Sequence, residues 1–516
     1  MLHITPARAF FRPNEPVRLM VSSDIPIESN IQADVYNLGE QLGKWTGKIS
    51  GTHAELVGNV PPVSGCGYLV RLICDMEVAF TAFDVLDHWT QAPRYGYIFD
   101  FKHDRTADDI AQTLDYLLAL HINGLQFYDW QYRHDTLIPP QDEFTDPLGR
   151  PLSLTTVRNL IVAAHMRSMA AMPYTAIYAA SPDYAASHAE WALYNEHGQV
   201  VDFANGFLKL MNPQCGWQQH FVQECASVLT ALPFDGIHID QYGEPKTGFD
   251  SQGDEVDLAS GFADTLQAVR NAIGTEKILL FNLVHNWPVE EIASSPLDFW
   301  YSELWPPDTS LRRLWQIIRE NRALNSRPAV LAVYIPPSWE HTVLAAQSRI
   351  LAAGGTHIAH GEHSTYLSDP YFPKAELPSP ALKSKLKQLA DFAVAYEQAL
   401  VFSDDITDTW SARVLLNNAP VQPGDIIVKA QGSRLFINLL RTGGNWSEEL
   451  SQEIKQDNVS LTLITRTEKL SRVWCATPEA PLPNTLSVET TITLPLYVEW
   501  LLICFEFGRA VDARPV

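Results

Sequence analysis

The sequence has no apolar run long enough to cross a bilayer, although the chain is 516 residues long. It also lacks a Lys/Arg cluster, and 60 acidic against 37 basic residues give a formal net charge of −23. Nucleic acid or an anionic membrane surface would be repelled by this charge. We therefore expect neither nucleic acid nor a membrane as a partner, and the composition leaves the oligomeric state open.

Motifs that hold metals, nucleotides or redox groups are missing as well. The six cysteines form no CxxC pair, and neither they nor the 16 histidines have the spacing of a zinc site. No GxGxxG stretch and no phosphate loop with Lys occurs. We expect no cofactor, no metal and buried free thiols, with a Cys66–Cys74 disulfide as the alternative.

The start of the chain bears on its compartment. A secretory signal would show a basic segment followed by an apolar stretch, and residues 1–6 show neither. The chain as written is therefore expected to be cytoplasmic, and secreted if the given start has been trimmed.

Strand and helix patterns predict a multidomain α/β protein with three parts. Residues 1–91 contain short alternating strands (17–21, 31–36, 68–72 and 78–83), which indicate an Ig-like β-sandwich. Residues 92–402 alternate apolar strands with helical patterns, and residues 403–516 return to strands typical of an antiparallel β-sandwich domain. A chain of this length is too long for one core.

The middle part predicts a (β/α)₈ TIM barrel. Its eight apolar strand candidates begin at residues 95, 124, 170, 236, 277, 299, 329 and 356. Helix patterns lie between them, such as 108–118, where apolar residues recur every three or four positions. The C-terminal ends of barrel strands form the rim that carries the active site. Polar residues at these strand ends are therefore the candidate functional residues.

Two carboxylates end the predicted fourth and sixth strands, Asp240 and Glu303. Side chains alternate along a strand, so both would point into the mouth of the barrel. Carboxylates about 5–5.5 Å apart serve as nucleophile and acid/base in retaining glycoside hydrolysis. Aromatic neighbours of Glu303 favour its protonated form, whereas Gln241 and Tyr242 could donate to an ionised Asp240. Alternatively, either acid caps a helix or pairs with an arginine.

Other strand-end side chains are candidates for binding substrate. They are Asp100, Asp129, Trp130, Tyr178, His238, Gln241, Trp305, Tyr334 and Glu362. Trp130 could stack on a sugar ring and Asp129 could hold hydroxyls, or Asp129 could pair with Arg133 at helical spacing. Asp100 could instead cap a helix, and Tyr178 and Tyr334 could be packing residues. Glu362 is the alternative to Glu303 for the role of catalytic acid. His238 is more typical of a histidine packed inside a barrel than of a catalytic one.

Several segments in order resemble glycoside hydrolase family 66, which contains endo-dextranases and cycloisomaltooligosaccharide glucanotransferases. The family's Asp-Gly-Ile-x-Ile-Asp-Gln strand is similar to Asp235–Gln241, and its Tyr-x-Glu-x-Trp strand is similar to Tyr301–Trp305. Residues 121–134, 361–363 with 371–373, and 395–397 also resemble the family. The resemblance implies Asp240 as nucleophile and Glu303 as acid/base.

The resemblance implies a retaining glycoside hydrolase that cleaves α-1,6-glucosidic linkages of dextran or isomaltooligosaccharides. Such a neutral substrate would not feel the negative charge of the chain. No inserted carbohydrate-binding module interrupts the barrel region, which disfavours a cyclising activity. An isomaltooligosaccharide transglucosylase or cyclising glucanotransferase is the enzymatic alternative, and a non-catalytic α-glucan-binding protein is the non-enzymatic one.

Overall fold

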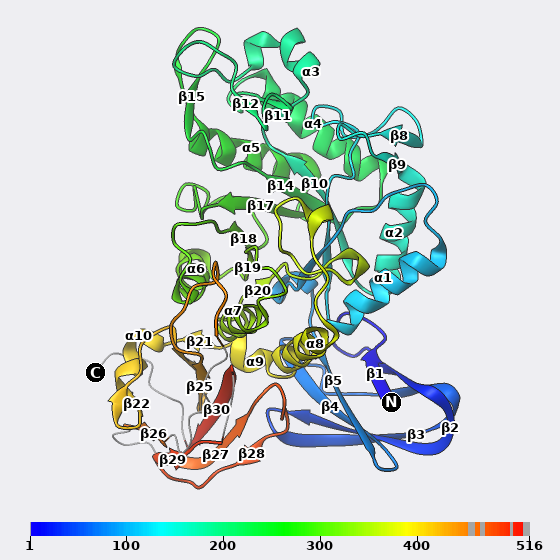
Figure 1. Cartoon of the computed structure of the whole chain (residues 1–516), viewed down its shortest axis with the longest axis vertical. Coiled ribbons are helices and arrows are strands. Elements are labelled where there is room, and N and C mark those ends of the chain that lie inside the picture. The colour runs from blue at the N-terminus through cyan, green and yellow to red at the C-terminus, as the bar shows by residue number, and fades with distance from the viewer. Residues whose placement is uncertain (1, 452–459, 465–469, 496–498, 509–516) are drawn as a thin grey trace.

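The computed structural model describes residues 2–451, 460–464, 470–495 and 499–508. Figure 1 shows the N-terminal strands at the lower right, the C-terminal strands at the lower left, and the helices and strands of the middle region above them. Figure 1 places both groups of strands beneath helices α7 and α8. The elements that lie furthest from these two groups of strands, at the top of Figure 1, come after strands of the middle region.

The N-terminal residues form one five-stranded antiparallel sheet with the path β1-β2-β4-β5, and β3 pairs with β2. The strands predicted at 17–21 and 31–36 are two parts of the single long strand β2. The sheet curls so that β1 contacts β5 around a shared apolar core. The Ig-like sandwich is therefore not confirmed. The bounds are β1 (Leu2–Pro6), β2 (Val17–Asn37), β3 (Glu40–Gly58), β4 (Cys66–Cys74) and β5 (Glu77–Val85).

Eight parallel strands form the barrel in the order β6-β7-β10-β14-β17-β18-β19-β20, as the sequence predicts. A parallel bridge between Tyr97 and Gly361 joins the two ends of this order, so the barrel is nearly closed. The bounds are β6 (Tyr95–Ile98), β7 (Gly124–Phe127), β10 (Ala170–Ala176), β14 (Gly236–Asp240), β17 (Ile278–Val284), β18 (Trp300–Glu303), β19 (Ala329–Ala332) and β20 (Thr356–His357).

Helices cover the outside of the barrel. Helix α1 begins at a capping box between Thr106 and Asp109, and it buries an apolar stripe that includes Leu114 and Leu117. The connection from β17 to β18 runs in turns over 285–294 rather than in a helix, which departs from eight regular βα units. The covering helices are α1 (Ala107–Ala119), α2 (Leu154–Met166), α4 (Gly216–Ala231), α5 (Leu258–Ile273), α6 (Leu311–Asn325), α7 (Glu340–Ala352) and α8 (Pro380–Ala395).

Additional elements follow the C-terminal ends of β7, β10 and β14. They lie at the top of Figure 1, on the side of the barrel away from the N-terminal sheet. The largest insertion is the small sheet β11-β13-β12 with helix α3. The bounds are β8 (Glu143–Thr145), β9 (Pro151–Ser153), β11 (Ala179–Ala180), α3 (Pro182–Ser187), β12 (Asp202–Phe203), β13 (Leu208–Leu210), β15 (Thr247–Phe249) and β16 (Glu255–Asp257).

Two antiparallel sheets, with orders β21-β24-β25-β30-β27-β28 and β23-β22-β26-β29, share one apolar core after the barrel. The sequence pattern predicts strands over 459–464 and 496–505, and of these residues 459 and 496–498 lie outside the described ones. The bounds are α9 (Glu397–Leu400), β21 (Asp404–Asp405), α10 (Thr407–Trp410), β22 (Val414–Leu416), β23 (Ala419–Pro420), β24 (Ile426–Gln431), β25 (Arg434–Leu440), β26 (Ser460–Leu463), β27 (Leu470–Ala476), β28 (Asn484–Thr485), β29 (Thr491–Thr493) and β30 (Trp500–Phe507).

Alternation along the barrel strands separates two cores. Ile237 and Ile239 of β14 belong to the large cluster packed under the helices, whereas Leu280 of β17 and Tyr301 of β18 belong to the cluster inside the barrel. Asp240 therefore shares a face with the inward side chains of its strand.

The six cysteines are free thiols, as expected, without a Cys66–Cys74 bridge. In the part of the chain described here, no helix has the length and apolar character to cross a membrane.

A buried arginine connects the N-terminal sheet with the barrel. Arg94, just before β6, donates from Nη1 to Asp84 of β5 and to Glu397 of α9, each at 2.8 Å. The same guanidinium donates to the carbonyl oxygens of Ala9 and His121. Because all these groups are buried, loss of the cation leaves two carboxylates without their counter-charge.

We predict that Arg94→Ala lowers the free energy of unfolding by about 3–5 kcal/mol. The exposed pair Arg18–Glu55, at 2.8 Å, provides a matched control. Arg18→Ala should cost less than about 1 kcal/mol, because water screens the pair. Urea denaturation of both variants measures the difference, and equal losses would contradict a structural role for the buried cluster.

Candidate active site

A pocket with a volume of about 790 Å³ opens at the C-terminal ends of the barrel strands. Asp240 is the last residue of β14 and Glu303 is the last residue of β18, and both line the pocket. Strand β17 lies between them and contributes Asn282. The structure thus places the two predicted carboxylates on one wall, separated by a single strand.

Asp240 accepts three hydrogen bonds. Its Oδ1 accepts from the main-chain N–H of Gln241 at 2.8 Å and from Nδ2 of Asn282 at 2.6 Å. Its Oδ2 accepts from the hydroxyl of Tyr174 at 2.8 Å. Burial and the negative charge of Glu303 raise the pKa of Asp240, while these donors act in the opposite direction.

Glu303 also accepts three hydrogen bonds. Its Oε1 accepts from the Tyr334 hydroxyl at 2.6 Å and from the Trp305 indole N–H at 2.9 Å, and its Oε2 accepts from Nδ2 of Asn282 at 2.6 Å. Burial raises the pKa of Glu303 against these donors. Two neighbouring, partly buried acids resist simultaneous ionisation, so the pair retains a proton to a higher pH than separate carboxylates would.

Asn282 fixes the spacing of the two acids. One nitrogen donates to both carboxylates, so the two accepting oxygens are no further apart than twice 2.6 Å. Sequence reasoning missed this residue. The available signal was that Asn282 is the only polar residue in the buried strand Ile278–Val284, where an unpaired amide is costly.

Below the acids, His238 packs inside the barrel. Its Nδ1 is 3.1 Å from the Tyr95 hydroxyl, and its ring contacts Tyr301 edge-on. Burial lowers the pKa of His238 to about 3, so the ring is neutral. Gln241 lines the pocket and donates to the carbonyl of Trp287 at 3.3 Å. Both side chains have partners that fix their orientation.

Asp129 lines the pocket, as predicted for a substrate-binding residue, and the alternative, an ion pair with Arg133, is wrong. Asp129 has a φ of 52°, so the chain leaves β7 in a left-handed turn rather than a helix, and four-residue spacing does not bring the two side chains together. Arg133 donates to two main-chain carbonyls, and Arg150 lies 3.6 Å from Asp129. Burial raises the pKa of Asp129 to about 7.

Trp130 and Tyr178 lie behind the pocket wall rather than in it. Trp130 is fully buried, and its indole N–H donates to the carbonyl of Tyr174 at 3.1 Å, so its face is not available to a sugar. Tyr178 is also buried, and its hydroxyl accepts from the main-chain N–H of Tyr242 at 3.0 Å. These two predicted site residues are packing residues.

Asp100 and Glu362 lie outside the pocket as well. Strands β6 and β20 end at Ile98 and His357, earlier than the sequence suggested, so neither acid occupies a strand end. Glu362 is fully buried, pairs with Arg105 and accepts the main-chain N–H of Asp100 at 2.5 Å. This position does not fit a rival for the acid role. Asp100 itself lies 3.4 Å from His363.

An aromatic wall borders the acids on one side. The ring of Phe203, from β12, stacks on Tyr242 with a centroid distance of 4.0 Å and an interplanar angle of 9°. Phe203 is 39% exposed and lines the pocket together with Phe207. Leu148 and Tyr371 line another part of it. Sequence reasoning missed this wall because its residues lie in insertions.

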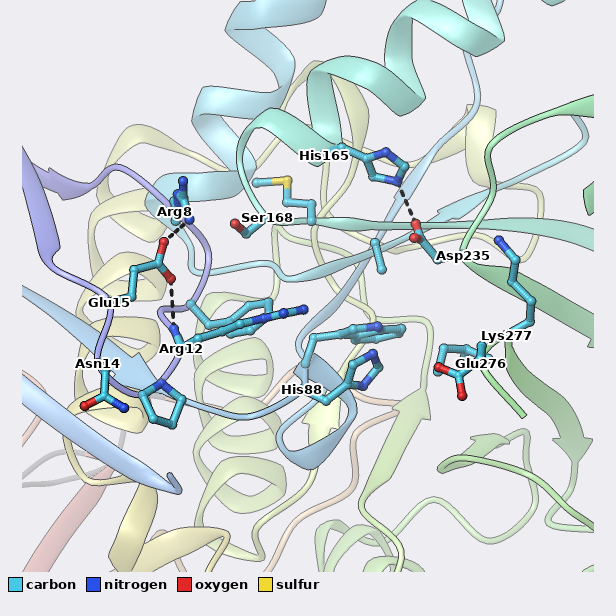
Figure 2. A pocket seen from close by; sticks show the side chains of 16 residues that line it. Arg8, Arg12, Asn14, Glu15, His88, His165, Ser168, Asp235, Glu276 and Lys277 are labelled. Carbon is cyan, nitrogen blue, oxygen red and sulfur yellow. Dashed lines mark hydrogen bonds and ion pairs between the residues drawn. The ribbon is translucent and has the colours of Figure 1, made fainter. Parts of the chain in front are cut away.

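A second pocket, of about 660 Å³, lies at the opposite ends of the barrel strands (Figure 2). Figure 2 shows Arg8 paired with Glu15 and His165 paired with Asp235. Glu15 and Asp235 each have a basic partner here, and among the described lining residues no donor is bonded to two carboxylates as Asn282 is in the first pocket. The first pocket is therefore the candidate active site.

Within the described ranges, no three His, Cys, Asp or Glu side chains are grouped to hold a metal ion.

Comparison with known proteins identifies the family of the chain. The profile of Glycosyl hydrolase family 66 matches residues 6–495. A cycloisomaltooligosaccharide glucanotransferase from Niallia circulans is 32% identical over 295 residues, which are 52% of this chain and 31% of that protein. A dextranase from Streptococcus salivarius is 23% identical over 252 residues, 43% of this chain and 30% of that protein. The chain belongs to glycosyl hydrolase family 66.

The solved structures confirm the fold. A cycloisomaltooligosaccharide glucanotransferase of Paenibacillus sp., solved with cycloisomaltoheptaose, superimposes with a TM-score of 0.89 at 22% identity. The match covers 97% of this chain and 99% of that chain. The aligned part of this chain spans about a third of the length of the curated relatives, 31% and 34% for two glucanotransferases of Niallia circulans.

We predict that Asp240→Asn stabilises the protein above neutral pH. The raised pKa of Asp240 means that its contribution to stability is present below about pH 4 and is lost as the pH rises through its folded pKa. Asn carries no charge, and its oxygen can still accept from Gln241 and Asn282. The variant should therefore exceed the parent by about 1–2 kcal/mol at pH 8 and match it near pH 4.

Denaturation of both proteins at the two pH values measures this difference. The exposed Asp254 supplies the control, since Asp254→Asn should leave stability unchanged at both. A destabilised Asp240→Asn at pH 8 would contradict the inferred repulsion between the two acids.

Proposed function

We propose that this chain is a retaining glycoside hydrolase, dextranase-like, that cleaves α-1,6-glucosidic linkages of dextran or isomaltooligosaccharides. The observation that carries the proposal is the single amide nitrogen of Asn282 within 2.6 Å of both Asp240 and Glu303. The two bonds keep the accepting oxygens within 5.2 Å (twice 2.6 Å) of each other. This upper limit is compatible with the about 5–5.5 Å between the carboxyl groups of retaining enzymes and falls short of the about 6.5–9.5 Å of inverting enzymes.

The reaction would proceed by double displacement. Asp240 attacks the anomeric carbon while the proton of Glu303 passes to the departing glycosidic oxygen. The C–O bond breaks, and a glucosyl ester forms on Asp240. Glu303, now ionised, takes a proton from water, whose oxygen attacks the anomeric carbon and releases Asp240. Two inversions give net retention.

The assignment of the two roles follows from their donors and from the family. Asp240 is the member of the pair that accepts a main-chain N–H, from Gln241, and a fixed donor favours the ionised form that a nucleophile needs. Glu303 lies between Trp305 and Tyr334, and the Tyr334 hydroxyl can accept a hydrogen bond when Glu303 is protonated. Asp240 is therefore assigned as nucleophile and Glu303 as acid/base.

The substrate class is supported by the relatives and by the pocket wall. Relatives in the family are called dextranase and cycloisomaltooligosaccharide glucanotransferase. The exposed ring of Phe203 offers an apolar face of the kind that packs against the C–H face of a sugar. A neutral glucan is also compatible with the net charge of −23.

Transfer to a sugar hydroxyl is the second candidate reaction. It is favoured because two of the relatives are glucanotransferases, 32% and 30% identical over the matched residues. The chemistry differs only in the acceptor: a glucan hydroxyl, rather than water, attacks the ester on Asp240. Cyclic products arise when that hydroxyl belongs to the same chain.

We predict that azide distinguishes the roles of the two acids. In Glu303→Ala, hydrolysis of glucosides with poor leaving groups should fall about 10²–10⁴-fold, and azide should restore turnover of an activated α-glucoside with an α-glucosyl azide as product. In Asp240→Ala, azide should take the place of the nucleophile directly and give the β-azide. Proton NMR of the products reads the anomeric configuration.

Exchange of the two azide products between the variants would show that the roles are reversed.

The non-catalytic alternative is tested with the parent protein and dextran. Absence of new reducing ends and of any change in glucan length, with dextran still retarding the protein on an affinity gel, would make it a glucan-binding protein.

We predict that Phe203→Ala weakens the use of long acceptors. Loss of one stacked ring should raise KM for longer isomaltooligosaccharides by about 2- to 10-fold and shift products from transfer toward hydrolysis. Phe203→Tyr is the control and should keep the parent pattern. Chromatography of products over time measures both, and an unchanged pattern in Phe203→Ala would remove the wall from substrate binding.

A further inference from the structure

Asn282 has a set of contacts that packing alone does not explain. Its side chain is 3% exposed, and the Nδ2 group uses its two hydrogens on two different carboxylates at 2.6 Å each. Its Oδ1 is buried and has no hydrogen-bond partner among the described residues. The two acids are therefore what orients the amide, since nothing holds its other end.

We propose that Asn282 is a positioning residue that stays bonded to both acids while negative charge passes from Asp240 to Glu303. The proposal rests on the proposed function, because it requires the two acids to exchange roles during one turnover. On this proposal the fifth barrel strand, β17, supplies the amide that holds both acids, a role that neither carboxylate can fill.

The electron and proton count of the first step explains the requirement. Before the step Asp240 is an anion and Glu303 holds a proton. As the ester forms, Asp240 loses its charge to the new bond, and Glu303 becomes an anion when its proton joins the leaving oxygen. One N–H of Asn282 faces each acid, so a donor is already in place for the charge at its start and at its end. The second step reverses the transfer.

An asparagine at this position meets three conditions at once. Its short side chain on β17 reaches the acids on both flanking strands, in register with Tyr301 of β18. Its amide is neutral, so it adds no charge that would favour one acid over the other. Its two donors lie in one plane, so neither must rotate during the step.

The experiment compares pH profiles of kcat/KM for the parent, Asn282→Ala and a matched control. Hydrogen bonds from Asn282 lower the pKa of both acids, so their loss should raise both. The acid limb reports Asp240 and the basic limb reports Glu303, so the whole bell should move upward by about one to two pH units. Asn123→Ala is the control, because Asn123 is equally buried at the other end of the barrel.

Asn123→Ala should lower stability without moving the bell. Asn282→Leu keeps the size of the side chain and removes the donors without adding a charge, so it should move the bell as far as Asn282→Ala and takes its place if the alanine variant fails to fold. A bell that stays in place in the folded Asn282 variants, with losses of activity and stability like those of Asn123→Ala, would overturn the proposal.

A readout that needs no turnover separates this proposal from the proposed function. Carboxyl ¹³C NMR titration, assigned by comparison with Asp240→Asn and Glu303→Gln, follows the two acids directly. Upward shifts of both pKa values in Asn282→Leu or Asn282→Ala support the coupling, including in a protein that releases no reducing ends from dextran. Unshifted titrations in an active enzyme overturn the coupling and leave the hydrolase assignment standing.

Discussion

The arrangement depends on the repulsion between two partly buried carboxyl groups held side by side in the wall of one pocket. Such groups cannot both ionise at low cost, and the fold brings them together only because β14, β17 and β18 are neighbours in one parallel sheet. Five donor groups compensate: one main-chain N–H, two tyrosine hydroxyls, one indole and the shared amide. The proximity of the two acids thus both raises their pKa and lowers the stability of the folded protein when both are ionised.

The interior of the barrel keeps this pair rigid. His238 and Tyr301 fill the space directly beneath the acids, and at the opposite end Trp89 closes the interior against Tyr95 and Phe299. These packed side chains have few alternative rotamers, and above them the hydrogen bonds to the two acids hold the acids at their separation. The buried Arg94 cluster fixes the N-terminal sheet to the same end of the barrel.

The barrel and the acid pair could be read from the sequence because both follow from strand periodicity. Asp240 and Glu303 end strands whose apolar residues alternate in a recognisable way. Strand ends were less predictable: β6 and β20 stop early, which moves Asp100 and Glu362 out of the pocket. Asp129 pairs with Arg150 rather than with Arg133 because a left-handed turn follows β7, and the spacing of residues in the sequence does not reveal such a turn. The N-terminal strands predicted a sandwich, yet a single curled sheet buries the same alternating residues.

The pocket wall and the acids come from different kinds of segment. Asp240 and Glu303 are the final residues of strands, whereas Phe203, Phe207 and Leu148 belong to insertions that begin only after a strand has ended. An insertion can therefore lengthen, shorten or change its aromatic residues without altering the register of β14, β17 and β18. On the proposed function, the strands supply the bond-breaking acids and the insertions supply the wall that contacts the sugar chain, so the two can change separately.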